Sequence, residues 1–127
     1  FGEGPEMNKI KKYIKINSNK ENIEIKGFIS HKKLQEILSY AKCFLSMSSY
    51  EGTPNAAIEA LANNCELFLS ETESHKDFFP KSIVNYVNIE TLNFKKKTKK
   101  DYTKILNFLN ECNIEIAFRK YKRFLKI

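Results

Sequence analysis

The 127-residue sequence has no tryptophan and is sparing in glycine (4), proline (3), cysteine (3) and histidine (2). It contains no apolar run of about 18 residues, so no membrane-spanning helix is expected. The N-terminus lacks a basic stretch followed by an apolar one, which argues against a signal peptide. Cysteines this few, odd in number and far apart predict buried, reduced thiols rather than disulfides; these are Cys43, Cys65 and Cys112. The two histidines lack partners at metal-ligand spacing, so no metal is expected.

The charge balance is basic, with 22 Lys and Arg against 15 Asp and Glu and a net charge of +7. Such a surface attracts nucleic acid, anionic lipid or a nucleotide diphosphate alike. Charge is the only feature that suggests nucleic acid, and no recognised motif supports it, so we expect none to bind. The apolar fraction of 42% is ordinary for a soluble globular domain. The length suffices for one hydrophobic core.

Helices and strands alternate along the first two-thirds of the chain. Apolar residues at helical spacing predict helices at 7–14, 30–41, 54–62, 74–79, 105–109 and 116–125. Short apolar runs predict strands at 23–28, 43–45, 67–69 and 83–87. The strand at 43–45 is expected to be buried. Alternation of this kind predicts an α/β fold, a Rossmann-like open parallel sheet with helices on both faces. In such sheets the ligand binds at the carboxyl ends of the strands.

The segment from Ser48 to Ala60 has the most informative chemistry. It follows a predicted strand and places the carboxylate of Glu51 in a loop, beside Gly52, whose backbone can turn or approach a ligand closely. Thr53 is the expected N-cap and Pro54 the first residue of the next helix. Because the first amides of a helix lack internal partners, this helix start is predicted to attract an anion.

Glu59 lies one turn further along the same predicted helix, on the face that carries Asn55. Its carboxylate could accept two hydrogen bonds from a vicinal diol such as a ribose. Each of these residues also has a plainer interpretation. Glu59 could be a surface glutamate, Glu51 could stabilise the helix start by charge alone, Asn55 could simply fill the first turn, and Phe28 could pack in the core.

Taken together, these segments resemble family 4 (group 1) retaining glycosyltransferases. Glu51 and Glu59, with Glu-Gly-Thr-Pro-Asn at 51–55, resemble the paired-glutamate motif of that family. The segment 1–5 resembles its Gly-x-Gly-Pro turn, 23–28 its Val-x-Phe-x-Gly strand, and 40–43 its Tyr-Ala-x-Ala step. The resemblance extends over residues 1 to about 80.

The resemblance implies a GT-B fold, in which two Rossmann-like domains enclose a cleft. Residues 1–127 would form a single, partial donor-nucleotide-sugar-binding domain, the C-terminal one of that fold. We expect the chain to be truncated at its N-terminus, without the acceptor domain and the first strand-helix unit, and therefore to be inactive alone.

The resemblance also assigns roles to residues. Glu51 would be the catalytic residue that contacts the donor sugar, and Glu59 would bind the ribose. Backbone groups of Gly52, Thr53, Pro54, Asn55 and Ala56 would meet the sugar and the diphosphate. Phe28 and Ile29 would border the base, and Gly4 belongs to the donor-binding turn. Neither a cofactor nor a metal is expected, because the leaving diphosphate is stabilised electrostatically.

The function expected from the resemblance is hexosyl transfer with retention, from a nucleotide-diphosphate sugar to a glycan or lipid-linked acceptor in cell-surface polysaccharide synthesis. The protein would be cytoplasmic or peripheral at the inner face of the membrane. The basic segment 95–100 suits either a solvated loop or a contact with an anionic membrane. The basic segment 119–123, in an amphipathic helix, could pack on the domain or lie on an anionic surface.

The alternative is a non-catalytic GT-B-like remnant or interaction module. The family's upstream Arg and Lys segment is absent, and 64–68 and 73–77 depart from its usual Gly-x-Pro-Val-Ile and Gly-Gly loop. Glu71 and Glu73 would repel a diphosphate if they faced the site.

Overall fold

The computed structural model describes residues 2–16, 22–88, 90 and 100–113. The predicted helix at 116–125 and all of the segment 95–100 except Lys100 lie outside these residues. The chain forms two compact units, Phe1–Ile37 and Leu38–Ile127. In neither unit, over the described ranges, is any helix long and apolar enough to cross a membrane.

The first unit contains α1 (Met7–Ile16) and most of α2 (His31–Tyr40). Both confirm the helical spacing, and the Ser30 hydroxyl accepts a hydrogen bond from the Lys33 amide at 3.3 Å, as an N-cap does. The strand predicted at 23–28 is wrong, because no strand forms there. Alternating side chains favour an extended backbone, but a strand also needs a hydrogen-bonded neighbouring strand. The Gly27 carbonyl accepts a hydrogen bond from the Gly2 amide (2.7 Å), and no ladder of such bonds forms at 23–28 within the described residues.

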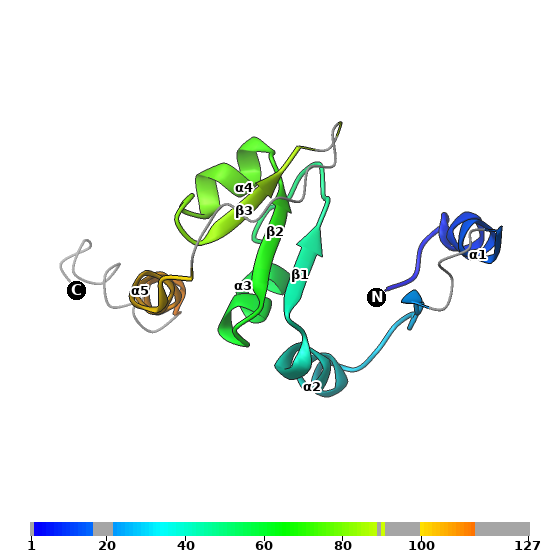
Figure 1. Ribbon diagram of the computed structural model, residues 1–127, viewed down its shortest axis with the longest axis horizontal. Coiled ribbons are helices and arrows are strands. Elements are labelled where there is room, and N and C mark those ends of the chain that lie inside the picture. The colour runs from blue at the N-terminus through cyan, green and yellow to red at the C-terminus, as the bar shows by residue number, and fades with distance from the viewer. Residues whose placement is uncertain (1, 17–21, 89, 91–99, 114–127) are drawn as a thin grey trace, which may run out of the picture. The chain divides into compact units, whose positions relative to one another are not determined.

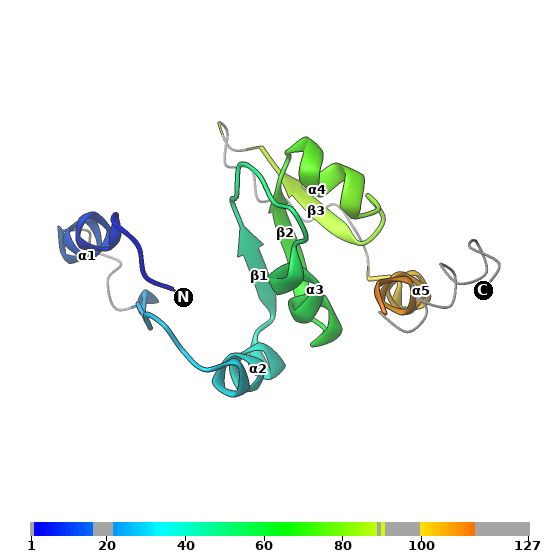
Figure 2. The same cartoon turned by 180° about the vertical axis from the view of Figure 1, so that it is seen from behind.

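The second unit is built on a parallel sheet of three strands in the order β1-β2-β3 (Figures 1 and 2). The strands are β1 (Cys43–Ser46), β2 (Glu66–Ser70) and β3 (Val84–Val87). The helices α3 (Asn55–Ala62) and α4 (Glu73–Phe78) connect them, and α5 (Tyr102–Cys112) follows. The fold is therefore α/β and Rossmann-like, as predicted.

The strand β1 lies at the edge of this sheet, although the sequence predicts a buried strand. Cys43 is exposed and Leu45 is 52% exposed. The apolar run predicted the strand correctly. Its burial would need a neighbouring strand on both sides, and among the described strands β1 has one neighbour, β2.

The core of this unit lies where α3 packs on β1 and β2. Ala57, Ala60 and Leu61 of α3 are buried, and so are Leu67 and Leu69 of β2. Cys65 joins this core, where burial raises the pKa of its thiol. Its thiol donates to the carbonyls of Leu38 and Ala41, at 3.5 and 3.4 Å. Burial was predicted for all three cysteines, but Cys112 is only partly buried and Cys43 is exposed.

Candidate functional site

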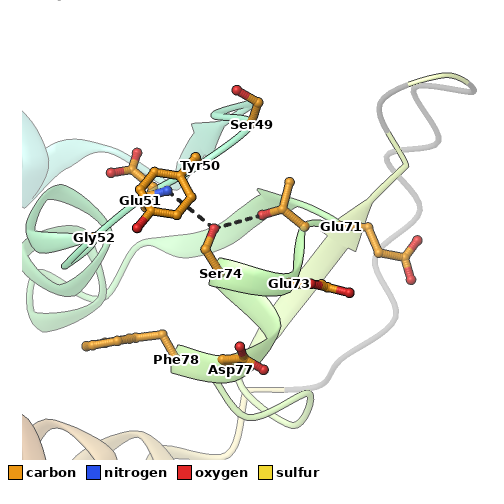
Figure 3. Close-up of a pocket in the computed structure, with 10 residues that line it drawn as sticks. Ser49, Tyr50, Glu51, Gly52, Glu71, Glu73, Ser74, Asp77 and Phe78 are labelled. Carbon is orange, nitrogen blue, oxygen red and sulfur yellow. Dashed lines mark hydrogen bonds between the residues drawn. The ribbon is translucent and has the colours of Figure 1, made fainter.

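The loops that leave β1 and β2 meet at the carboxyl ends of these strands. The Ser70 hydroxyl, at the end of β2, donates to the Ser48 carbonyl at 2.5 Å. The Glu51 amide donates to the Ser74 hydroxyl at 3.3 Å (Figure 3). These bonds hold the loop that carries Glu51 against the end of β2 and the first turn of α4, at the edge where an open parallel sheet binds ligands.

A depression of about 780 Å³, here called the acidic depression, opens between these loops (Figure 3). It is lined by residues 49–52, 71–74, 77 and 78. Four carboxylates border it, those of Glu51, Glu71, Glu73 and Asp77, and its described lining has no lysine or arginine. Lys76 pairs with Glu71 at 3.3 Å and offsets part of the charge. Glu71 and Glu73 thus border the site, where they would repel a phosphate but accept hydrogen bonds from hydroxyls.

The helix α3 begins one residue later than predicted. Its N-cap is Pro54, with φ −80° and ψ 61°, and no side chain caps the helix. Thr53 as the N-cap is therefore wrong, because the non-helical ψ of Pro54 moves the helix start past it. The Asn55 amide donates to the Thr53 carbonyl at 2.8 Å and the Ala57 amide to the Pro54 carbonyl at 3.0 Å. Between them, the Ala56 amide makes no backbone hydrogen bond within the described part of the chain.

A second, smaller depression of about 170 Å³, here called the helix-tip depression, lies at the start of α3. It is lined by Phe44, Ser46, Glu51, His75 and residues 53–57. Glu51 borders both depressions. Of the predicted donor-binding residues, Thr53, Pro54, Asn55 and Ala56 thus lie together with Glu51 around one small space, and Gly52 lies next to them in the acidic depression.

Glu59 occupies a different place. It lies in the second turn of α3, where its side chain is half-buried. Within the residues that the structure describes, it lines neither the acidic nor the helix-tip depression. The contact of Glu59 with a ribose stays a prediction, and it requires a ligand that extends along α3 from the helix tip.

Gly52 does not need the conformational freedom of glycine. Its φ lies outside the left-handed region, and a Cβ built on it would meet no atom within 4 Å. The backbone of the loop can thus accept a side chain here, and the open space beside Gly52 is free for a ligand.

The remaining predicted donor-binding residues belong to the first unit. Gly4 borders a depression with Met7, Lys11 and Ile25. Phe28 is 82% exposed, so the interpretation of it as a core residue is wrong, and Ile29 is half-buried. A contact of these residues with a base stays a prediction.

Comparison with known families decides the class of the protein. A family model described as glycosyl transferases group 1 matches residues 1–88. The chain belongs to this family. Neither the curated proteins nor the solved structures that were compared gave a match. Glycosyl transfer is accordingly the class of reaction of this group 1 glycosyltransferase domain, and the matched range contains every candidate residue named above.

One residue of this glycosyltransferase site escaped the sequence analysis. From the sequence, His75 falls in the helix predicted at 74–79, and either a cleft-facing or a solvent role is open to it; in the structure its side chain is fully buried and lines the helix-tip depression. A helix of six residues has too few turns for its spacing to reveal a buried face. The nearby Ser70 and Thr72, which contact His75, gave no recognisable signal.

Proposed function

We propose that this chain forms the donor-binding part of a family 4, GT-B retaining glycosyltransferase. It would transfer a hexose from a nucleoside-diphosphate sugar to a glycan or lipid-linked acceptor in cell-surface polysaccharide synthesis, in the cytoplasm or at the inner face of the membrane. The observation that carries the proposal is the position of Glu51, which borders both depressions directly before α3.

The sugar suits the carboxylates. A hexose brings several hydroxyl donors and no charge, and carboxylate oxygens accept strongly from such donors. We assign the sugar to the space beside Glu51, whose backbone is held by the hydrogen bond from its amide to the Ser74 hydroxyl. Glu51 is not one of two carboxyl groups that flank a scissile glycosidic bond, as in a glycoside hydrolase. It contacts the donor sugar, and the acceptor attacks the sugar on the same face from which the diphosphate leaves.

The diphosphate suits the start of α3. The acidic depression repels phosphate, whereas the helix start attracts it through the partial positive charge of its amides. Thr53, Asn55 and Ala56 are exposed there, and the Ala56 amide is a candidate donor. In this arrangement no metal is needed for the leaving group. Glu59 binds the ribose, Phe28 and Ile29 border the base, and Gly4 belongs to the donor-binding turn.

A transfer assay on the intact protein tests the proposal. It is incubated with nucleoside-diphosphate sugars of several sugars and bases, and the products are identified by mass spectrometry and NMR. We expect transfer with retained anomeric configuration, lowered about 100-fold or more by Glu51→Gln. The matched control is Glu90→Gln, because Glu90 is exposed and lines none of the described depressions. An inverted product, or equal activity of the two variants, contradicts the assignment.

The second candidate is a non-catalytic remnant of the same fold. The observation that favours it is the absence of lysine and arginine from the described linings of both depressions, which leaves a diphosphate without a cation. This candidate predicts neither hydrolysis nor transfer from any nucleoside-diphosphate sugar in the same assay. A single turnover product excludes it.

A further inference from the structure

One ring nitrogen of His75 has hydrogen-bond partners, and the other has none among the described residues. Its side chain is fully buried. Nδ1 lies 3.0 Å from the Ser70 carbonyl oxygen, 3.0 Å from the Ser70 hydroxyl and 3.2 Å from the Thr72 hydroxyl. Nε2 is also buried, yet it has no hydrogen-bond partner among the described residues. A buried polar atom without a partner is rare in folded proteins and calls for an explanation.

The contacts of Nδ1 determine the tautomer. A carbonyl oxygen only accepts, so the contact with the Ser70 carbonyl requires a proton on Nδ1. The Ser70 hydroxyl gives its own proton to the Ser48 carbonyl and is therefore an acceptor toward His75 as well. In the neutral ring, Nε2 then carries a lone pair. The unpartnered atom is a hydrogen-bond acceptor and needs an O–H or N–H donor.

The place of His75 indicates which kind of group could supply that donor. His75 lines the helix-tip depression, together with Glu51 and the start of α3. This space of about 170 Å³ has room for a small substituent rather than a whole nucleotide. A fully ionised phosphate oxygen offers no proton, whereas a sugar hydroxyl does.

We propose that His75 is a specificity-determining residue, whose Nε2 accepts a hydrogen bond from a hydroxyl of the donor sugar in the helix-tip depression. This inference rests on the proposed function. Nε2 is buried in this structure, so a hydroxyl can reach it only if the rim of the depression opens. The cost of the unpartnered acceptor is then recovered only with a sugar that has a hydroxyl at the matching position, which is how a buried polar group discriminates between ligands.

Two substitutions separate the two ring nitrogens. His75→Asn can keep a donor near the position of Nδ1 but has no atom at the position of Nε2, and His75→Gln reaches the position of Nε2. The intact protein is titrated with UDP-glucose and GDP-mannose, and with UDP and GDP as the sugar-free probes. We expect His75→Asn to weaken binding of the sugar nucleotide about tenfold while the matched nucleoside diphosphate binds as before. His75→Gln should keep part of the affinity.

Nitrogen NMR of the wild-type imidazole gives a readout that does not depend on a variant folding. We expect the ¹⁵N signal of Nε2 to shift on adding the sugar nucleotide that binds and to stay in place with the nucleoside diphosphate. An unmoved Nε2 signal, or an equal loss of both ligands in His75→Asn, overturns the role of His75 alone. Failure of the wild-type protein to bind these probes and every other nucleoside-diphosphate sugar of the transfer assay contradicts the proposed function itself, and this inference with it.

Discussion

The Glu51 amide and the Ser74 hydroxyl are joined by a hydrogen bond of 3.3 Å across 23 positions of the chain. The loop after β1 is thereby attached to the first turn of α4 (Figure 3). The position of the candidate catalytic glutamate consequently depends on the crossover that follows β2 as well as on its own loop.

The partly buried hydrogen bond from the Ser70 hydroxyl to the Ser48 carbonyl should contribute measurably to stability. Ser70→Ala leaves the Ser48 carbonyl without its donor and removes one of the acceptors around His75 Nδ1, so we expect a loss of about 1–3 kcal/mol in the free energy of unfolding. Urea denaturation measures it. Ser49→Ala, an exposed position in the same loop, is the control and should change little. Equal stability of the two variants would contradict the account.

The Tyr86 hydroxyl donates to the carbonyls of His75 and Phe79, at 3.1 and 2.7 Å. Burial raises its pKa from 10.0 to about 12. The folded state therefore holds the phenolic proton after the unfolded state has lost it, and stability falls as pH rises from 10 to 12. Below pH 10, Tyr86→Phe should lower the free energy of unfolding by about 1 kcal/mol relative to wild type. Denaturation curves at pH 9 and pH 11.5 should show this difference shrink, and a constant difference is the opposing result.

Gly52→Ala should separate folding from binding. Open space surrounds Gly52 and its φ is not left-handed. We therefore expect the free energy of unfolding to be unchanged or raised by about 0.4–1 kcal/mol. Affinity for a nucleoside-diphosphate sugar should fall, because the added methyl group enters the space assigned to the ligand. Gly27→Ala is the contrasting control: its φ of +61° should make the variant less stable. Unchanged affinity in Gly52→Ala would show that no ligand approaches there.

Local patterns were enough to predict most of the fold. The apolar runs at 43–45 and 67–69 became β1 and β2, and α3 ends at Ala62, as the helix predicted at 54–62 does. The strand at 23–28 failed because alternation of side chains predicts an extended backbone without supplying its hydrogen-bonding neighbour. For the same reason the burial of β1 was not predictable from Cys43 and Leu45 themselves.

The candidate site was predictable in its sequence but not in its geometry. The motif placed Glu51 before a helix, and the structure gathers residues 53–56 around that carboxylate. The Pro54 ψ that shifts the helix start is a matter of backbone geometry. Glu71 and Asp77 line the same depression as Glu51 because the segment after β2 and the helix α4 pack against the loop after β1. The burial of His75 likewise depends on contacts with Ser70 and Thr72 that its own short helix does not reveal.

The central claim is that Glu51 and Glu59 bind one nucleoside-diphosphate sugar from opposite ends of the first turns of α3. Isothermal titration of the intact protein with its nucleoside-diphosphate sugar, for wild type, Glu59→Ala and the control Glu90→Ala, tests it most directly. Alanine is the best helix former, so α3 should persist in Glu59→Ala, as circular dichroism can verify. The account predicts that Glu59→Ala abolishes measurable binding while Glu90→Ala binds like wild type. Unchanged affinity in folded Glu59→Ala would contradict it.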